Sequence, residues 1–241
     1  MRSLLHALIW TRRHLAGQLP ARELTPLLRC LAPDDLFLDV GVHAGSWTIP
    51  ASRVLRAGHV YAFEALPYYG KVLKSTLALL RRLNVTVVVG AVSDAAGEVS
   101  IVWKDAAGRR LTGMTHISRG REAGESVRVR ALTIDGFLRD RPGGRVRLMK
   151  CDVEGAELMV LRGSAATIDR WRPLVFCELY ESYCAQYGYS TKEVFDFFVA
   201  RDYRCAQFDG GTYHLLEPAA YSGEGDVLFV PRETGLPPAC G

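Results

Sequence analysis

The hydrophobic positions of this chain fall into short apolar runs separated by stretches with helical spacing. The run Leu36 to Val40 is apolar at four of five positions and stops at a glycine, which is typical of a buried strand. Residues 46 to 55 have the composition of a helix, with Pro50 tolerated near its start. A second apolar run ends at Glu64. The pattern predicts a strand, a glycine turn, a helix and a second strand.

The same pattern extends to both ends of the chain. Further helices are expected over about 3–16, 24–31, 68–83, 133–140, 154–169 and 191–201. Further strands are expected over 84–92, 99–103, 127–131, 145–152, 173–179, 203–208 and 226–230. Strands that alternate with helices and end in a hairpin predict an α/β fold with a mostly parallel sheet and a terminal antiparallel pair.

The 241 residues fit one α/β domain. We expect residues 1–32 to form an N-terminal helical cap and 33–241 the main domain, with an insertion of strands and a lid over about 97–131. The polar stretch 104–126 is interpreted as a lid that faces the substrate. For the helix at 3–16, packing on the domain is favoured over the alternative that its amphipathic pattern allows, a helix on a membrane surface.

Charge and cysteine content narrow the function classes. The formal net charge of +4 comes from scattered arginines, so nucleic acid is not a required partner. No run approaches the ~20 apolar residues that span a bilayer, and no signal peptide is recognisable. The cysteines form no C-x-x-C pair and are interpreted as reduced thiols of a cytoplasmic protein. They are Cys30, Cys151, Cys177, Cys184, Cys205 and Cys240.

The glycine turn carries the first candidate chemistry. A carboxylate such as Asp39, inside an apolar strand, is costly to bury without a partner, which suggests a nearby ligand. Gly41 and Gly45 let the backbone turn sharply and approach that ligand. An acid at the tip of the second strand, here Glu64, accepts hydrogen bonds from the hydroxyls of a ribose. A nucleoside-bearing cofactor is therefore expected.

The spacing of the glycines discriminates between cofactors. A dinucleotide site needs G-x-G-x-x-G, whose second glycine admits the pyrophosphate, and here His43 stands at that position. S-adenosylmethionine (SAM), which has a ribose but no phosphate, fits the turn better. An NAD-dependent oxidoreductase is the less favoured alternative.

A second motif packs acids around the turn after the strand at 145–152. Glu154 and Glu157 could do no more than cap the following helix. Lys150 and Asp152 lie among core-like residues and are stronger candidates for chemistry. Asp39, Asp152 and a third acid, Glu178, end strands whose carboxyl ends we expect at one edge of the sheet, where open α/β folds bind ligands.

The stretch K-C-D-V-E-G-A-E-L-M-V-L-R-G, from Lys150 to Gly163, resembles the signature of the FkbM family of SAM-dependent methyltransferases. The resemblance runs from about Asp35 to Val230. It includes the D-V-G-x-x-x-G turn, the A-F-E strand end at Glu64, the segment 113–115 and the closing D-V-L-F-V-P. It implies a class I methyltransferase (Rossmann-like) α/β fold with a seven-stranded sheet and helices on both faces.

The resemblance also implies site residues. SAM is the implied cofactor, with the turn at its methionine end, Glu64 at its ribose, the segment Ala91, Val92 and Ser93 at its adenine, and Asp152 beside the reacting centre. Two positions depart from the family pattern, His43 for asparagine and Ala65 for proline. The implied cofactor-binding set is Asp39, Gly41, His43, Gly45, Glu64, Ala65, Ala91, Val92 and Ser93.

The implied reaction is O-methylation of a hydroxyl of a sugar or natural product, such as a glycoside, polyketide or lipid. A hydroxyl acceptor needs a base, and the candidates are Asp152, then His116 in the lid, then His43. Lys150 completes the candidate catalytic set. A divalent cation held by acids and His116 is a minority alternative. A non-catalytic SAM-binding protein is a rival function, and a homo-oligomer is left open.

Overall fold

The computed structural model describes residues 2–19, 22–111, 114–118, 120, 124–141 and 143–239. Gly113 and Cys240, which entered the predictions above, lie outside these residues, as do parts of the stretch predicted to be a lid. None of the described helices is both long and apolar enough to cross a membrane. No disulfide joins the cysteines of the described residues.

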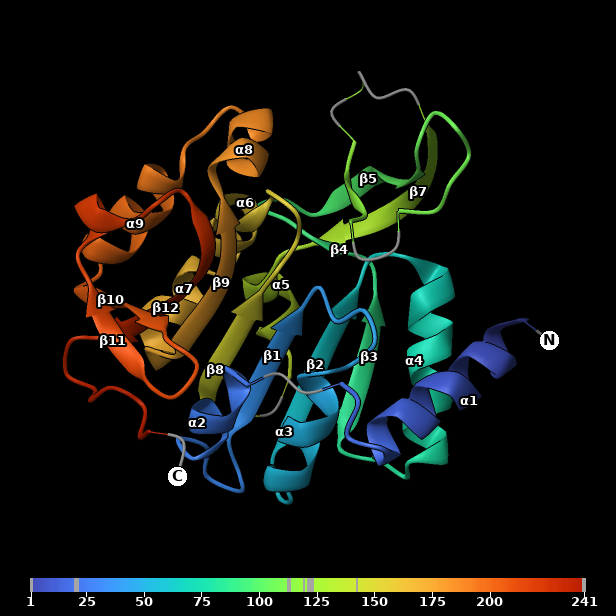
Figure 1. Cartoon of the computed structure of the whole chain (residues 1–241), viewed down its shortest axis with the longest axis horizontal. Coiled ribbons are helices and arrows are strands. Elements are labelled where there is room, and N and C mark those ends of the chain that lie inside the picture. Colours follow the sequence, from blue (N-terminus) through green and yellow to red (C-terminus); the bar gives the residue numbers. More distant parts are fainter. Residues whose placement is uncertain are drawn as a thin grey trace.

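The core of the molecule is a mostly parallel sheet with the order β11-β10-β12-β9-β8-β1-β2-β3 (Figure 1). Strands β3, β2, β1, β8 and β9 run parallel, and β12 inserts antiparallel between β9 and β10. The strands are β1 (Leu36–Val40), β2 (His59–Glu64), β3 (Val85–Val89), β8 (Val146–Cys151), β9 (Leu174–Tyr180), β10 (Tyr203–Phe208), β11 (Tyr213–Leu216) and β12 (Glu224–Pro231). The predicted class of fold is confirmed, and so is the terminal antiparallel pair.

The described part of this sheet has eight strands rather than the predicted seven. The extra edge strand is β11, which pairs with β10 through a tight turn. Asp209 Oδ1 accepts the backbone N–H groups of Gly211 and Thr212 and so shapes that turn. The ring of Tyr213 is buried, and its hydroxyl donates to the Glu23 carbonyl at 2.8 Å. These long-range contacts hold a strand that its short apolar run did not predict.

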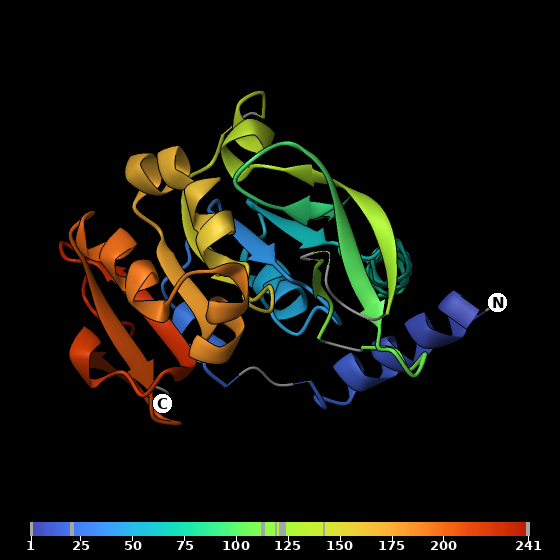
Figure 2. The same ribbon diagram turned by 90° about the horizontal axis from the view of Figure 1, so that it is seen from above.

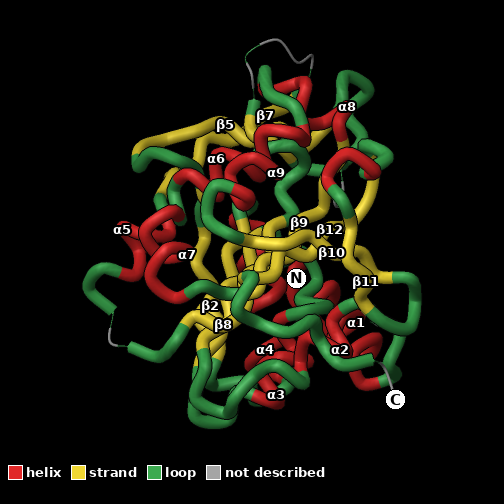
Figure 3. The backbone as a smooth tube through the Cα atoms, turned by 90° about the vertical axis from the view of Figure 1, so that its left-hand side faces the viewer, coloured by secondary structure: helices red, strands yellow, loops and turns green. Residues whose placement is uncertain are grey.

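Helices cover both faces of the sheet, as predicted (Figures 2 and 3). Side chains of α6, α7 and α9 pack on one face, and those of α2, α3, α4 and α1 pack on the other. Short α5 and α8 lie beside the sheet. The helices are α1 (Arg2–Leu15), α2 (Leu24–Leu28), α3 (Thr48–Val54), α4 (Pro67–Leu79), α5 (Ile134–Leu138), α6 (Glu157–Arg162), α7 (Ala165–Trp171), α8 (Glu181–Cys184) and α9 (Thr191–Val199).

A second, four-stranded sheet has the order β4-β7-β5-β6. Its strands are β4 (Ala91–Val92), β5 (Gly97–Lys104), β6 (His116–Ile117) and β7 (Glu125–Leu132). The antiparallel pairing of β5 with β7 confirms the predicted strand pair. The prediction of one strand over 84–92 was wrong, because the chain turns at Gly90, which has a φ of +153°, and β4 then joins the second sheet.

The prediction of one helix over 154–169 was also wrong, since the chain forms α6 and α7 with a break at Gly163 and Ser164. A Cβ at Gly163 would lie only 2.1 Å from the Ser93 carbonyl oxygen. The Ser164 hydroxyl donates back to the Val160 carbonyl at 2.7 Å. Close packing on the end of β4 therefore ends α6 early.

Candidate functional site

The glycine turn after β1 packs directly on the end of β8. Gly41 has a φ of +83°, and a Cβ there would lie 1.7 Å from the Asp152 carbonyl oxygen. Gly45 has a φ of +76°, and its Cβ would lie 2.9 Å from Leu73 of α4. Both positions combine a left-handed backbone with a close approach, so each requires glycine. The turn is thereby fixed between β8 and α4.

Asp39 lies at the base of this turn and is fully buried. Its Oδ2 accepts a hydrogen bond of 2.6 Å from Thr48 at the start of α3, and its Oδ1 lies 3.9 Å from Lys150 Nζ without a hydrogen-bond partner among the described residues. Burial raises the pKa of Asp39, against the opposing charge of Lys150. The carboxylate is therefore held in place mainly by α3 and Lys150.

Lys150 connects the glycine turn to Asp152, which directly follows β8. Its buried ammonium donates to the Gly41 carbonyl at 2.9 Å and to Asp152 Oδ2 at 2.8 Å. Burial alone would lower the pKa of Lys150, but the charges of Asp152 and Asp39 outweigh it and raise that pKa. Lys150 is therefore a charged brace between two strand ends.

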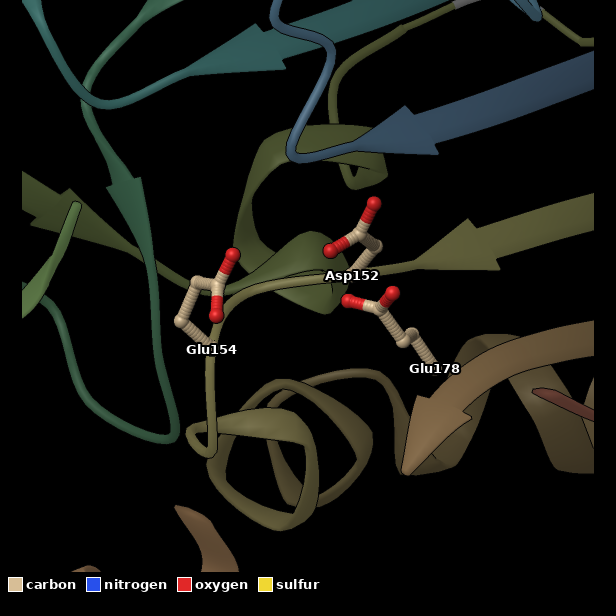
Figure 4. A group of neighbouring side chains, drawn as sticks. All are labelled: Asp152, Glu154 and Glu178. Atoms are coloured by element: carbon tan, nitrogen blue, oxygen red, sulfur yellow. The ribbon is translucent and has the colours of Figure 1, made fainter. Parts of the chain in front are cut away.

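Three carboxyl groups from two strand ends gather next to this brace (Figure 4). Oxygens of Asp152, Glu154 and Glu178 all lie within 4.8 Å of one another. His116, included in the predicted metal set, is not part of this group. The three acids could hold a divalent cation by their chemistry, although the Lys150 ammonium already binds one oxygen of Asp152.

The three acids differ in pKa because they lie close together and are buried. Burial raises the pKa of Asp152, but Lys150 and a hydrogen bond with Glu178 outweigh burial, so the pKa of Asp152 is lowered. Burial and the neighbouring Asp152 raise the pKa of Glu178 to about 9. Burial and Asp152 also raise the pKa of Glu154 to about 7. Asp152 is therefore the most readily ionised of the three acids, and Glu178 is the one that keeps its proton to the highest pH.

Glu157 caps the turn at the start of α6, as the capping interpretation predicts. Its Oε1 accepts the backbone N–H groups of Val153 at 3.0 Å and Gly155 at 3.2 Å. The side chain is fully buried, and burial raises the pKa of Glu157 to about 7. Glu157 supports the shape of the turn that carries Asp152.

Replacement of Glu157 by glutamine is expected to change how stability depends on pH. Between its usual pKa and the raised value, native Glu157 holds a proton that the unfolded chain has lost, so the stability of the native protein falls as pH rises. A glutamine side chain does not titrate, so the free energy of unfolding of Glu157→Gln should rise relative to the native protein by about 3 kcal/mol from pH 4.5 to 7. Urea unfolding across this range measures the difference. If the difference in free energy of unfolding between Glu157→Gln and the native chain stayed constant from pH 4.5 to 7, the raised pKa of Glu157 would be wrong.

Glu64, the last residue of β2, is buried and faces the same turn. Its Oε2 accepts the backbone N–H of His43 at 3.1 Å, and its Oε1 accepts that of Leu66 at 2.9 Å. Burial raises the pKa of Glu64 to about 7, against these two hydrogen bonds. The Glu64 carboxyl group thus fixes the backbone of the loop that follows β1 and of the loop that follows β2.

A cavity opens above these strand ends, between the main sheet and the second sheet. Of the predicted site residues, eight line it: Gly41, His43, Glu64, Ala65, Ala91, Val92, His116 and Asp152. Asp39, Gly45, Ser93 and Lys150 are not among its lining residues. The remaining wall residues were not in the predicted set of site residues, although Glu154 was considered there as a helix cap and Thr115 lies in the segment 113–115; they are Val40, Phe63, Tyr69, Gly90, Ile101, Thr115, Ile117, Val153 and Glu154. The structure therefore brings together acids, two imidazoles and apolar walls from both sheets.

His116 lines this cavity from β6, which lies within the stretch 104–126 that was predicted to be a lid. Its Nδ1 lies 3.2 Å from the Met114 carbonyl oxygen, so Nδ1 carries the proton of that contact. Its Nε2 is buried and has no hydrogen-bond partner among the described residues. The next residue is tied down, since the Tyr187 hydroxyl donates to the Ile117 carbonyl at 2.8 Å. The imidazole is positioned with a free acceptor nitrogen.

The N-terminal helix α1 closes the outer side of the glycine turn, a contact that the sequence did not predict. His14 Nε2 donates to the Ala44 carbonyl at 2.8 Å. The ring of Trp10 lies 5.5 Å from that of His43 and stacks on Tyr69 at 6.1 Å. Burial and Lys150 lower the pKa of His43, whose ring is enclosed by these aromatic side chains. His43 is consequently a neutral wall residue.

The strand order, with acids at the ends of neighbouring parallel strands and a glycine turn below a cavity, defines a class I methyltransferase fold. The family model described as Methyltransferase FkbM domain matches residues 39–205. The chain belongs to this family of methyltransferases.

Solved structures resemble the chain at low sequence identity. The methyltransferase FkbM of Methylobacillus flagellatus KT aligns with a TM-score of 0.52 at 14% identity, over 83% of this chain and 44% of that one. The chain thus spans less than half the length of that protein. Cofactor-bound Rv0187 from MTB aligns with a TM-score of 0.48 at 15% identity, over 97% and 91% of the two chains. Precorrin-6y C5,15-methyltransferase from Geobacter metallireducens GS-15 gives 0.45 at 16% identity, over 86% and 85%. No curated protein sequence matches this chain.

Proposed function

We propose that this chain is a SAM-dependent O-methyltransferase that acts on a hydroxyl group of a sugar or natural-product acceptor. The observation that carries the proposal is the position of Glu64, Asp152 and His116 around a single cavity above the glycine turn. Family membership supports methyl transfer. The free cysteines of the described residues support our proposal of a cytoplasmic location.

The residues of this cavity suit SAM. Glu64 has lone pairs left on both oxygens to accept the two ribose hydroxyls, beyond its two backbone contacts. Ala91 and Val92 offer an apolar wall for adenine, and Gly41, which packs on the Asp152 carbonyl, would line the cavity at the methionine end. SAM supplies a methyl group on a positively charged sulfur, which the ionised Asp152 would favour electrostatically. We propose the binding set of the sequence analysis, with Asp39, Gly45 and Ser93 as supports behind the cavity.

The proton of the acceptor hydroxyl needs a base at the cavity. Asp152, the first candidate, has a lowered pKa because it is paired with Lys150, which weakens it as a base. His116 offers an Nε2 that has no hydrogen-bond partner in the part of the chain that the structure describes, with its Nδ1–H held by the Met114 carbonyl. We therefore propose His116 as the base, with Asp152 orienting the acceptor and balancing positive charge.

His116→Gln is expected to lower kcat by about 10²- to 10⁴-fold while the Kd for SAM changes little, because the imidazole would act on the acceptor proton only. Asp152→Asn should lower turnover by a smaller factor and should also weaken SAM binding, because it removes the negative charge proposed to face the sulfonium. Calorimetry with SAM and transfer of labelled methyl measure both quantities. A larger loss of kcat in Asp152→Asn than in His116→Gln would return the role of base to Asp152.

The proposed reaction is tested by incubation of the chain with labelled SAM and a panel of hydroxylated glycosides, polyketides and lipids. Label in an ether linkage of at least one acceptor is the expected result. Tight SAM binding with no transfer to any acceptor would favour a non-catalytic SAM-binding protein. Binding of NAD rather than SAM in calorimetry would favour an oxidoreductase. We do not expect this result, because the side chain of His43 lines the cavity at the position where a dinucleotide site needs its second glycine.

A further inference from the structure

Helix α1 exposes apolar side chains on the face opposite to the one that packs on the domain. Its inner face buries Ala7 and Trp10 against α4. Its outer face carries large apolar side chains that remain exposed in the described part of the chain: Leu4, Leu5, Leu8, Ile9 and Leu15. We call these five residues the α1 face. An outward apolar stripe is unusual for a surface helix, whose outer face is normally polar.

Helix α4, on which α1 lies, continues this apolar surface. It adds Leu79, and the turn that follows it adds Leu83, which is 91% exposed. In Figures 1 and 2 α1 lies across α4 at the margin of the molecule, so its outer face points away from the rest of the fold. Seven of the ten large apolar side chains that are exposed in the described residues belong to these two segments. The exposure is thus concentrated at one place.

Charge is equally concentrated here. Residues 2–19 and 67–83 contain no acid, and all 26 Asp and Glu residues of the chain lie elsewhere. The same two segments contain cationic residues whose side chains are exposed: Arg12, Arg13, Lys71, Lys74 and Arg81. Exposed apolar side chains on two segments whose own charged residues are all cationic match the chemistry of a bilayer surface that contains anionic lipid.

We propose that the α1 face docks the protein on the surface of a membrane with anionic headgroups. The apolar side chains would enter the boundary between headgroups and acyl chains, and the arginines and lysines would contact the phosphates. A second copy of the chain fits this surface poorly, because a two-fold contact would set the arginines and lysines of one copy against those of the other. Docking in this way requires no segment that crosses the bilayer.

The docking surface is connected to the cavity by direct contacts. Trp10 lies on the inner side of α1 and contacts the rings of His43 and Tyr69, which both line the cavity. His14 of the same helix bonds to the glycine turn. A membrane under α1 would therefore lie one helix away from the proposed SAM site.

The test is co-sedimentation of the full chain with vesicles. Vesicles of phosphatidylcholine with roughly one third phosphatidylglycerol should bind the protein, more weakly at high salt, and phosphatidylcholine alone should bind it much less. The variant Leu5→Glu/Ile9→Glu changes two exposed positions of the α1 face, so folding should be retained, and its binding to anionic vesicles should fall by more than about tenfold. Circular dichroism and SAM binding check that the variant is folded.

The control is Leu215→Glu, which places one glutamate, against two in the α1 face variant, at a leucine 56% exposed on β11, at the opposite edge of the main sheet. Its vesicle binding should equal that of the native chain. The proposal is overturned if the native chain does not bind anionic vesicles, or if the α1 face variant and the β11 variant bind equally well. A native dimer that becomes monomeric in Leu5→Glu/Ile9→Glu, without vesicle binding, would also overturn it in favour of self-association.

Discussion

Glu64→Ala is expected to weaken SAM binding by at least about a hundredfold. In the proposed complex the Glu64 carboxylate accepts both ribose hydroxyls, and hydrogen bonds to a charged group contribute about 1.5–3 kcal/mol each. The substitution also removes the acceptor for the backbone N–H groups of His43 and Leu66, so both loops that border the cavity lose a fixed contact. Isothermal titration calorimetry with SAM measures the loss.

The control for this prediction is Glu224→Ala, which removes an exposed carboxylate at the start of β12 and should leave SAM affinity unchanged. Thermal unfolding of both variants shows whether each is folded at the temperature of the titration. If Glu64→Ala bound SAM within about threefold of the native chain, the ribose role of Glu64 would be wrong.

Lys150→Met is expected to lower the free energy of unfolding by about 3–5 kcal/mol. The substitution leaves Asp39 buried without its cation and removes the partner of Asp152, and an uncompensated buried charge is among the most destabilising changes in a protein. It also removes the bond from the ammonium to the Gly41 carbonyl. For a chain of this size the loss corresponds to a fall in Tm of about 10 °C, measured by scanning calorimetry.

Lys192→Met provides the comparison, because Lys192 forms an exposed ion pair with Asp196 at 2.7 Å on α9. Exposed pairs contribute at most about 1 kcal/mol, so its Tm should move by no more than a few degrees. Equal losses in the two variants would mean that burial does not distinguish the two lysines. Lys150 would then have no special part in holding the site.

The sequence was sufficient to predict the edge of the sheet at which the site lies. Asp39, Glu64, Asp152 and Glu178 each end an apolar run, and parallel strands bring their carboxyl ends to one edge. The glycine turn was predictable for the same reason, since Gly41 and Gly45 are local signals for a left-handed backbone. These features depend on short segments and on a general rule of α/β folds.

Features that depend on contacts between distant segments could not be predicted. The bond from His14 to Ala44 spans 30 residues, and the bond from Tyr187 to Ile117 spans 70 residues. Neither contact produces a pattern of hydrophobic and polar residues that could be recognised in the sequence. The break at Gly163 is similar, because it arises from close packing on the Ser93 carbonyl. The bond from Lys150 to the Gly41 carbonyl, which spans 109 residues, likewise emerged only from three-dimensional geometry.

A crystal structure of the chain with S-adenosylhomocysteine tests the central claim most directly. The proposal predicts the ribose hydroxyls within hydrogen-bond distance of Glu64, the adenine against Ala91 and Val92, and the sulfur on the side of Asp152 and His116. Density for the ligand outside this cavity, or a ribose that faces away from Glu64, would contradict the proposed site.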